Sequence, residues 1–153
     1  MDRRDVGGWL EGPGRLTQQG AYAGERLGLP ASGPGAMAPL GRRVLALLVD
    51  WLLCCAIAIG LLRMPVGATG LDSFIPLAVF AVENVLLVGT AGCTIGHRLL
   101  GLQVRRVAGG PLGVVGAALR TLLLLLVIPP VVWDSDGRGL HDKAAGSVIV
   151  RTR

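Results

Sequence analysis

The sequence predicts an all-α membrane protein with three hydrophobic helices and two short strand-like segments. Hydrophobic residues make up 52% of its 153 residues and charged residues only 16%, whereas a typical soluble domain is about one quarter charged. Three apolar runs of about twenty residues each follow a polar beginning. A helix of that length rises about 30 Å, which matches the hydrocarbon core of a bilayer. The pattern therefore favours lipid over water as the medium around the folded chain.

The first part of the chain has a different composition. Residues 1–39 are rich in Gly, Pro and Arg and show no helical or alternating apolar period. Such a segment predicts a disordered tail in front of a transmembrane domain over residues 40–153. No apolar stretch follows the early arginines, so the segment does not have the pattern of a secretory signal peptide.

The three apolar runs are expected to form spans at residues 44–62, 74–92 and 112–133. Arg42 and Arg43 precede the first run, and three further arginines lie between the second and the third. The loop after the first run contains a single basic residue, Arg63. Basic residues are concentrated on the cytoplasmic side of multi-pass membrane proteins, so we expect a cytoplasmic N-terminus.

The third run has two possible courses. Pro129 and Pro130 break it near its end. The segments near 102–107 and 147–152 have strand-like composition next to glycine. Three simple spans, the favoured interpretation, would put the C-terminal tail outside. Paired strands would have to lie on one side of the membrane, and the third run would then be re-entrant.

Each apolar run contains an ionisable side chain at a similar depth. Asp50, Glu83 and Arg120 are expected about 9, 13 and 12 Å from the cytoplasmic ends of their runs. A charge at a helix centre costs about 3 kcal/mol, so three unpaired charges would cost on the order of 9 kcal/mol. We therefore expect the Arg120 guanidinium to bridge both carboxylates, with Asn84 supplying a further hydrogen bond.

This predicted cluster has two interpretations. In the first, it is purely structural and fixes how the three helices pack. In the second, the excess negative charge of two carboxylates over one guanidinium binds a proton or a small cation, because intramembrane carboxylates commonly mark such pathways. The residues alone leave both interpretations open.

Four blocks of the sequence, taken in order, resemble the RDD family of bacterial membrane proteins. They are "RRVLALLVD", "TIGHRLLGLQV", Arg120 and "RGLHDKAAGSVIV", within residues 39–152. The Arg and the two Asp for which the family is named correspond by position to Arg43, Asp50 and Asp142. Two positions depart from the family pattern.

The departures are His97, where the family often has Lys, and Ser147, where Thr is usual. We expect both positions to be peripheral. The resemblance implies a polytopic protein of the cytoplasmic (plasma) membrane, in a family whose function is largely uncharacterised. Transport, including sodium–proton exchange, has been proposed for some members, but kinship of fold does not transfer that activity.

The stretch around Asp142 is expected to form a clamp at the membrane interface. Its carboxylate would accept from Arg43 or Arg98, and Lys143 would face the lipid headgroups. The side chain of His141 is expected to point away from Asp142, because neighbouring residues of a helix or strand diverge.

Other classes of function find little support. The sequence has no nucleophile elbow or phosphate-binding glycine loop, so we expect no enzyme and no cofactor. His97 and His141 are the only histidines and are too far apart in sequence to suggest a metal site. Scattered arginines and a single tyrosine argue against nucleic acid. The three cysteines are expected to be buried apolar side chains.

Two classes of function therefore stay open. The first is a small cation or proton transporter, expected to be a homo-oligomer because three short spans enclose little interior. The second is a membrane scaffold or assembly protein whose tail or basic loop binds a protein partner. In both, the lipid bilayer is the predicted partner of the apolar surface.

Overall fold

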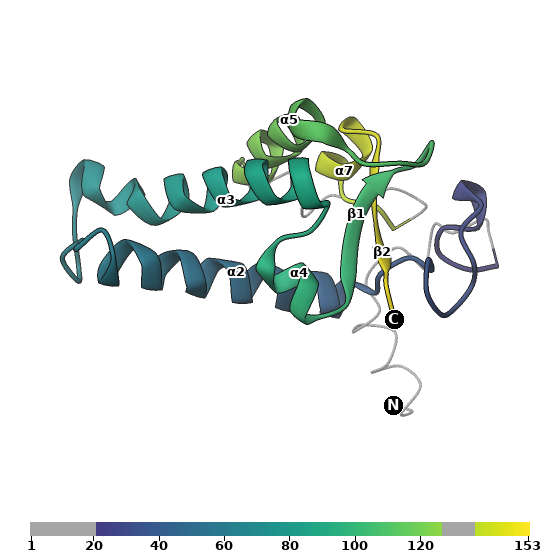
Figure 1. Cartoon of the computed structure of the whole chain (residues 1–153), viewed down its shortest axis with the longest axis horizontal. Helices are drawn as coiled ribbons and strands as arrows, with labels where there is room; N and C mark the ends of the chain where they lie inside the picture. The colour runs from purple at the N-terminus through teal and green to yellow at the C-terminus, as the bar shows by residue number, and fades with distance from the viewer. Residues whose placement is uncertain (1–20, 127–136) are drawn as a thin grey trace, which may run out of the picture.

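The computed structural model describes residues 21–126 and 137–153. Its most prominent feature is a hairpin of two long helices, α2 (Leu40–Gly60) and α3 (Ile75–Ala91), which projects from the rest of the molecule (Figure 1). The 3-10 turn η3 (Gly70–Phe74) leads directly into α3. With η3 included, both segments are long and apolar enough to cross a membrane, at mean hydropathies of 2.1 and 1.9. These two helices correspond to the first two predicted spans.

The apolar side chains of this hairpin mostly face outward. Only 22% of each apolar window is buried within the chain. Leu48, Leu52, Val82 and Leu86 are each more than half exposed. A core helix of a soluble protein would bury such side chains, since each is worth about 1.5–3 kcal/mol when removed from water. The exposed apolar surface therefore indicates helices that face lipid.

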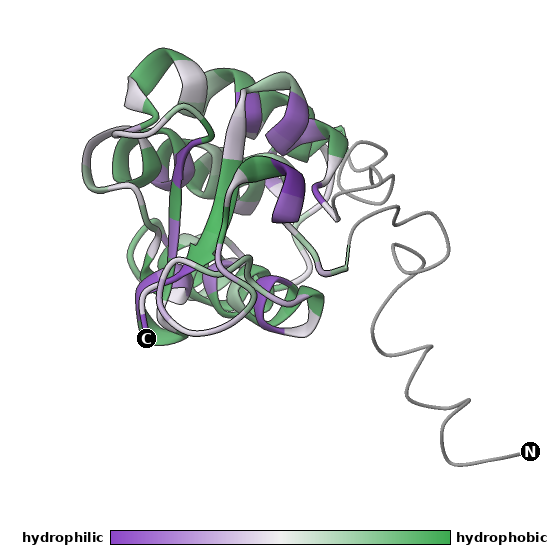
Figure 2. Ribbon diagram, turned by 90° about the vertical axis from the view of Figure 1, so that its right-hand side faces the viewer, coloured by the Kyte–Doolittle hydropathy of each residue, from purple (hydrophilic) through white to green (hydrophobic). Residues whose placement is uncertain are grey.

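The predicted strand-like segments both form strands, and they pair. β1 (Leu102–Arg106) and β2 (Ser147–Arg151) make a two-stranded antiparallel sheet, with Leu102 opposite Arg151 and Arg106 opposite Ser147. The short helix α4 (Ile95–Leu99) connects α3 to β1. The sheet lies at the end of the molecule away from the hairpin tip, and Figure 2 views the molecule from this end.

Residues 21–39 differ from the expected disordered tail. After the 3-10 turn η2 (Glu25–Leu27), the chain runs along β2, and the N–H of Ala38 donates to the carbonyl of Ile149 at 2.9 Å. Met37 forms an isolated bridge with Val150. The open edge of β2 offers unpaired backbone groups, and an added strand satisfies them. The other expected tail residues, 1–20, lie outside the described part of the chain.

The third apolar run is described only up to residue 126, and the end of the predicted span, 127–133, lies outside the described residues. α5 (Gly113–Leu125) has 13 residues and packs mainly on α3. A Cβ added at Gly89 would come within 2.9 Å of the Val114 backbone, so a glycine permits this close approach. The proline pair at 129–130 lies outside the described residues. The short helix α7 (Leu140–Ala144) then packs against both α5 and β2.

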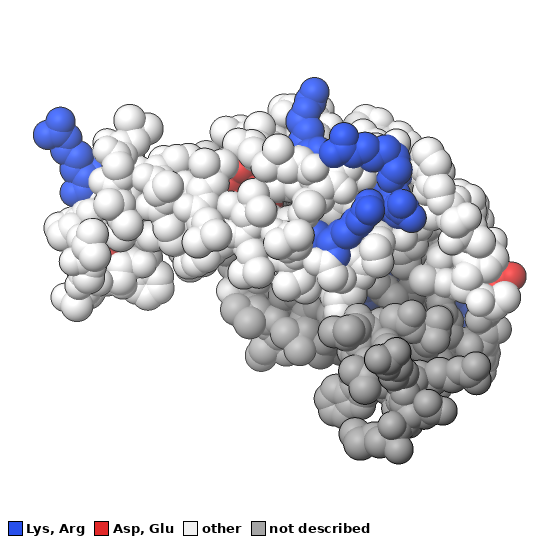
Figure 3. Space-filling view, turned by 90° about the horizontal axis from the view of Figure 1, so that it is seen from below, with Lys and Arg blue, Asp and Glu red and all other residues white. Residues whose placement is uncertain are grey.

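The sheet end is also the basic end of the molecule. Seen from below, Lys and Arg side chains gather over the region of α4 and the C-terminus (Figure 3). Arg42, Arg98 and Arg153 are exposed residues of these elements or of the start of α2. The loop between α2 and η3 contains Arg63 as its basic residue. The unequal distribution of arginines between the loops, seen in the sequence, thus corresponds to a basic surface at one end of the hairpin.

Candidate functional site

A cavity of about 100 Å³ lies where the base of the hairpin meets α4, α5 and α7. Its polar lining residues are Arg43, Asp50, Asn84, His97, Arg120, His141 and Asp142. Six of these seven are residues that the sequence singles out as a site. The Arg and the two Asp that the resemblance pointed to therefore line one cavity, although Asp142 is distant in sequence from the other two. We treat this cavity and the carboxylates beside it as the candidate functional site.

Arg120 pairs with Asp142 rather than with the two carboxylates of the hairpin. The Arg120 Nε donates to Asp142 Oδ1 at 2.7 Å, and both side chains are almost fully buried. The expected bridge from Arg120 to Asp50 and Glu83 is therefore wrong. The reason is that α7 folds back onto α5, which brings a carboxylate 22 residues away along the chain to the guanidinium.

The Asp142 carboxylate is buried inside the protein and does not form the expected interfacial clamp. It also accepts from Ser147 Oγ at 2.9 Å, and its Oδ2 lies 3.4 Å from His141 Nε2. Burial alone would raise the pKa of Asp142. The charges of Arg120, His141 and Arg43 and the hydrogen bond from Arg120 together outweigh this, so the pKa lies well below its ordinary value and the group is an anion. The prediction that His141 and Asp142 point apart is wrong, because both face the cavity from one short turn of helix.

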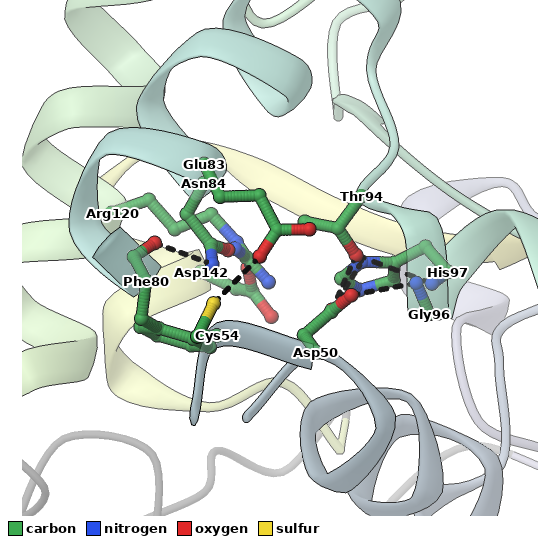
Figure 4. A network of polar contacts seen from close by, with 10 residues as sticks. All are labelled: Asp50, Cys54, Phe80, Glu83, Asn84, Thr94, Gly96, His97, Arg120 and Asp142. Atoms are coloured by element: carbon green, nitrogen blue, oxygen red, sulfur yellow. Dashed lines mark hydrogen bonds and ion pairs between the residues drawn. The ribbon is translucent and has the colours of Figure 1, made fainter. Parts of the chain in front are cut away.

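Asp50 is held by groups at the start of α4. Its Oδ2 accepts from Thr94 Oγ1 at 2.5 Å, and its Oδ1 accepts from the Gly96 N–H at 2.6 Å (Figure 4). Thr94 is the N-cap of α4, and its hydroxyl oxygen also accepts from the backbone N–H of His97. These bonds fasten α4 to the middle of α2.

The side chain of His97 completes this group. Its Nδ1 lies 2.5 Å from Thr94 Oγ1 and 4.0 Å from Asp50 Oδ2. Burial lowers the pKa of His97 to about 3, and the positive charges of Arg120 and Arg43 act in the same direction. The imidazole is therefore neutral at physiological pH.

Glu83 lies next to the Asp50 group without an arginine partner in the described part of the chain. Figure 4 shows its carboxylate between Cys54 and the Asp50 group. The Cys54 thiol donates to Glu83 Oε2 at 3.0 Å. Glu83 Oε1 is buried and has no close hydrogen-bond partner among the described residues, although the backbone N–H of Ile95 acts on this carboxyl group. Asn84 does not join this cluster through its amide nitrogen, which donates to the Phe80 carbonyl of its own helix at 3.1 Å.

The remaining predicted residues lie at the edge of the site or outside it. The Arg43 Nε donates to the Ala38 carbonyl and its Nη1 to the Gly137 carbonyl, so Arg43 ties the start of α2 to the segment before α7. Arg98 and Lys143 are exposed. The acceptor for Arg98 was expected to be Asp142, whose carboxylate instead bonds Arg120.

Sequence reasoning missed four members of the site. His97 and Ser147 were expected to be peripheral but are buried, and Thr94 and Gly96 were not singled out. One usable signal was present: Thr94 at the start of "TIGHR" has the residue type of a helix N-cap, which would have predicted a short helix there. The contact of Gly96 with α2 had only a weak signal, the four-residue spacing of Gly92 and Gly96 in a sequence with 24 glycines. In residues 21–126 and 137–153, no three His, Cys, Asp or Glu side chains are grouped so as to hold a metal ion.

Two long helices with outward-facing apolar side chains, and a cavity at their base into which charged side chains point, indicate a small membrane protein. The chain matches the family model described as RDD family over residues 37–146, which is well over half its length. It belongs to the RDD family, as the four sequence blocks predict. No curated protein and no solved structure gives a significant match to the chain.

Proposed function

We propose that this RDD-family protein binds a proton or a small cation at Asp50 and Glu83 and carries it across the membrane. One observation carries the proposal. Asp50 and Glu83 are the central residues of the two lipid-facing helices, and the buried arginine expected to neutralise them is engaged by Asp142. Two carboxylates at that depth are unfavourable as anions unless a proton or cation joins them.

The net charge near Asp50 and Glu83 favours binding of a proton or cation. It does so more strongly than it would if Arg120 bridged the two carboxylates, as the sequence predicted. The Arg120–Asp142 pair is neutral as a unit, so Asp50 and Glu83 have no arginine in direct contact among the described residues, although the charge of Arg120 still acts on Asp50. The two carboxyl groups also repel each other electrostatically. A single proton or monovalent cation shared near them removes that repulsion. Glu83 Oε1, which has no close hydrogen-bond partner among the described residues, is available to bind such a ligand.

We further propose that the third apolar run is re-entrant and that both strands face the cytoplasm. The residues before α5 and after α7 belong to one two-stranded sheet, so the run begins and ends on the same side. The 13 residues of α5 extend about 20 Å, less than a hydrocarbon core of about 30 Å. The basic surface around α4 supports a cytoplasmic position for this end.

Cysteine labelling tests this topology. In a background with the three native cysteines changed to serine, single cysteines are placed at exposed Thr69, Ala108 and Thr152. With a membrane-impermeant reagent, we expect Ala108→Cys and Thr152→Cys to react from the cytoplasmic face and Thr69→Cys from the opposite face. Labelling of positions 108 and 152 from opposite faces would mean that the third run crosses the membrane.

Ion flux tests the transport proposal. Liposomes containing the full chain are given a gradient of Na⁺, K⁺ or Li⁺, and the internal pH is followed. We expect the wild type to couple the cation gradient to proton movement, and Asp50→Asn and Glu83→Gln to reduce the signal to the protein-free level.

Asp72→Asn is the matched control, because Asp72 is an exposed carboxylate in η3, outside the site. It should retain wild-type flux. A wild type that is indistinguishable from empty liposomes with all three cations would refute the transport proposal.

The scaffold interpretation is the second candidate, and a specific observation favours it. The hydrogen bonds of Asp50 with Thr94 and Gly96, and the pair of Arg120 with Asp142, join elements that are distant in sequence. If the cluster is purely structural, Asp50→Asn lowers the stability of the protein, and the wild type itself shows no ion flux. The liposome experiment therefore separates the two candidates.

A further inference from the structure

The contacts of Thr94 fix the direction of a short hydrogen-bond chain. An ionised Asp50 has no proton to donate, so at Oδ2 it must accept the hydroxyl hydrogen of Thr94. The Thr94 oxygen then has only acceptor capacity left for His97 Nδ1, 2.5 Å away. His97 Nδ1 must therefore carry the hydrogen. In the neutral imidazole, this leaves Nε2 as a bare acceptor.

The free nitrogen of His97 is the accessible end of this chain. Among the described residues Nε2 has no hydrogen-bond partner, yet it is not one of the fully buried unpartnered atoms. His97 also lines the cavity. Water in that cavity therefore has a route to Nε2. Asp50 also lines the cavity, but it is 1% exposed against 6% for His97, and both of its oxygens already accept hydrogen bonds, from Thr94 and from the Gly96 N–H.

We propose that His97, Thr94 and Asp50 form a proton relay that loads Asp50 from the cavity. A proton binds His97 Nε2, the Nδ1 proton passes to Thr94 Oγ1, and the hydroxyl proton of Thr94 passes to Asp50 Oδ2. One proton has entered, Asp50 is neutral, Thr94 is again a hydroxyl, and His97 is neutral with its hydrogen on Nε2. Every hydrogen bond of the chain has reversed its direction.

The surrounding charges favour passage of the proton over its retention on the imidazole. The groups around the relay are Arg43 from α2, Glu83 and Asn84 from α3, Arg120 from α5, and His141 and Asp142 from α7. Arg43 and Arg120 disfavour a second positive charge on His97. Asp50 and Glu83 repel each other as anions, so a proton taken up by Asp50 removes that repulsion.

The relay deepens the proposed function, since Asp50 is the acceptor in both, but it is measured without transport. The full chain, labelled with ¹⁵N-histidine, is placed in lipid nanodiscs and titrated towards acid. NMR reports the tautomer of each histidine, and there are only two, so His141→Gln assigns the signals. Infrared spectroscopy reports a protonated carboxyl group, and Asp50→Asn assigns its band.

We expect His97 to be the Nδ1–H tautomer at neutral pH. Over the pH range in which the Asp50 carboxyl band appears, His97 should switch to the Nε2–H tautomer. Thr94→Val, which has the shape of threonine without the hydroxyl, should abolish the link between the two changes. Thr94→Ser, which keeps the hydroxyl, should retain it.

Three results would overturn the relay: an Nε2–H tautomer at neutral pH, protonation of Asp50 without a tautomer switch, or Thr94→Val behaving like the wild type. The first two are measured on the wild type and do not depend on a variant folding. Linked titration without ion flux would leave the relay standing and refute only the transport proposal. Ion flux without linked titration would refute the relay and leave the transport proposal standing.

Discussion

Replacing Arg120 by methionine is expected to lower the free energy of unfolding by about 3–5 kcal/mol, because it leaves the Asp142 carboxylate buried without its counter-ion. Asp142→Leu should have a loss of similar size, since Arg120 is only 3% exposed. Stability is measured by denaturant unfolding of the detergent-solubilised protein. The double variant Arg120→Met/Asp142→Leu should recover most of the loss, because neither member of the pair is then buried without its partner.

Arg98→Met is the matched control for this pair. Arg98 is exposed, so the change should stay within about 0.5 kcal/mol. If the double variant were as unstable as the sum of the two single variants, the two side chains would contribute independently. The pair would then not be the internal anchor that the structure indicates.

The same pair gives a dependence on pH with a definite sign. Arg120 holds the pKa of Asp142 below the ordinary value of 3.8, so the folded chain binds this proton less readily than the unfolded chain. The pair therefore contributes its full stability above pH 3.8 and loses it as the pH falls below that value. Asp142→Asn should show a shallower loss than the wild type in that acid range.

Gly96→Ala is expected to cost about 3 kcal/mol, because the new Cβ has no space. It would lie 2.3 Å from the Ala46 carbonyl oxygen and 2.9 Å from Asp50 Oδ1, and the first of these is backbone that cannot rotate away. The helix α4 must then move off α2, which breaks the 2.6 Å bond from the Gly96 N–H to Asp50. Denaturant unfolding under the conditions used for Arg120 measures the loss.

Gly41→Ala is the control for the effect of an added methyl group. Gly41 lies in the first turn of α2, with ordinary helical backbone and no atom within 4 Å of its Cβ position. Alanine favours a helix over glycine by about 1 kcal/mol, so this variant should be equal to or more stable than the wild type. Equal stability of Gly96→Ala and Gly41→Ala would contradict the close packing of α4 on α2.

Much of the fold was predictable because its signals are local. The apolar runs at 44–62 and 74–92 identify α2 and α3 within a few residues, since length and composition alone make a helix that fits lipid. The segments near 102–107 and 147–152 have β-branched and alternating composition, which identified both strands. The third run was harder, since α5 ends at Leu125 and the predicted length did not account for where the helix stops.

The membership of the site was also largely predictable, but its pairing was not. Asp50, Glu83 and Arg120 stood out because charges inside apolar runs are rare and costly. Depth along each helix limits which charges lie at one level, but it says nothing about which faces of the helices meet. The partner of Arg120 came from a turn of helix 22 residues later, which the sequence alone placed at the membrane interface.

The order of residues along the chain, then, determined the medium in which this protein folds and the family to which it belongs. The medium follows from composition and the family from short sequence blocks, and neither requires knowledge of which parts of the chain are in contact. Only the tertiary structure decided that Asp142 neutralises Arg120, that Asp50 and Glu83 contact no guanidinium of the described residues, and that His97 and Thr94 lie next to Asp50. The physical reason is that an ion pair or a hydrogen bond depends on a few ångströms of separation in space. That separation is set by how α4 and α7 fold back onto the helices.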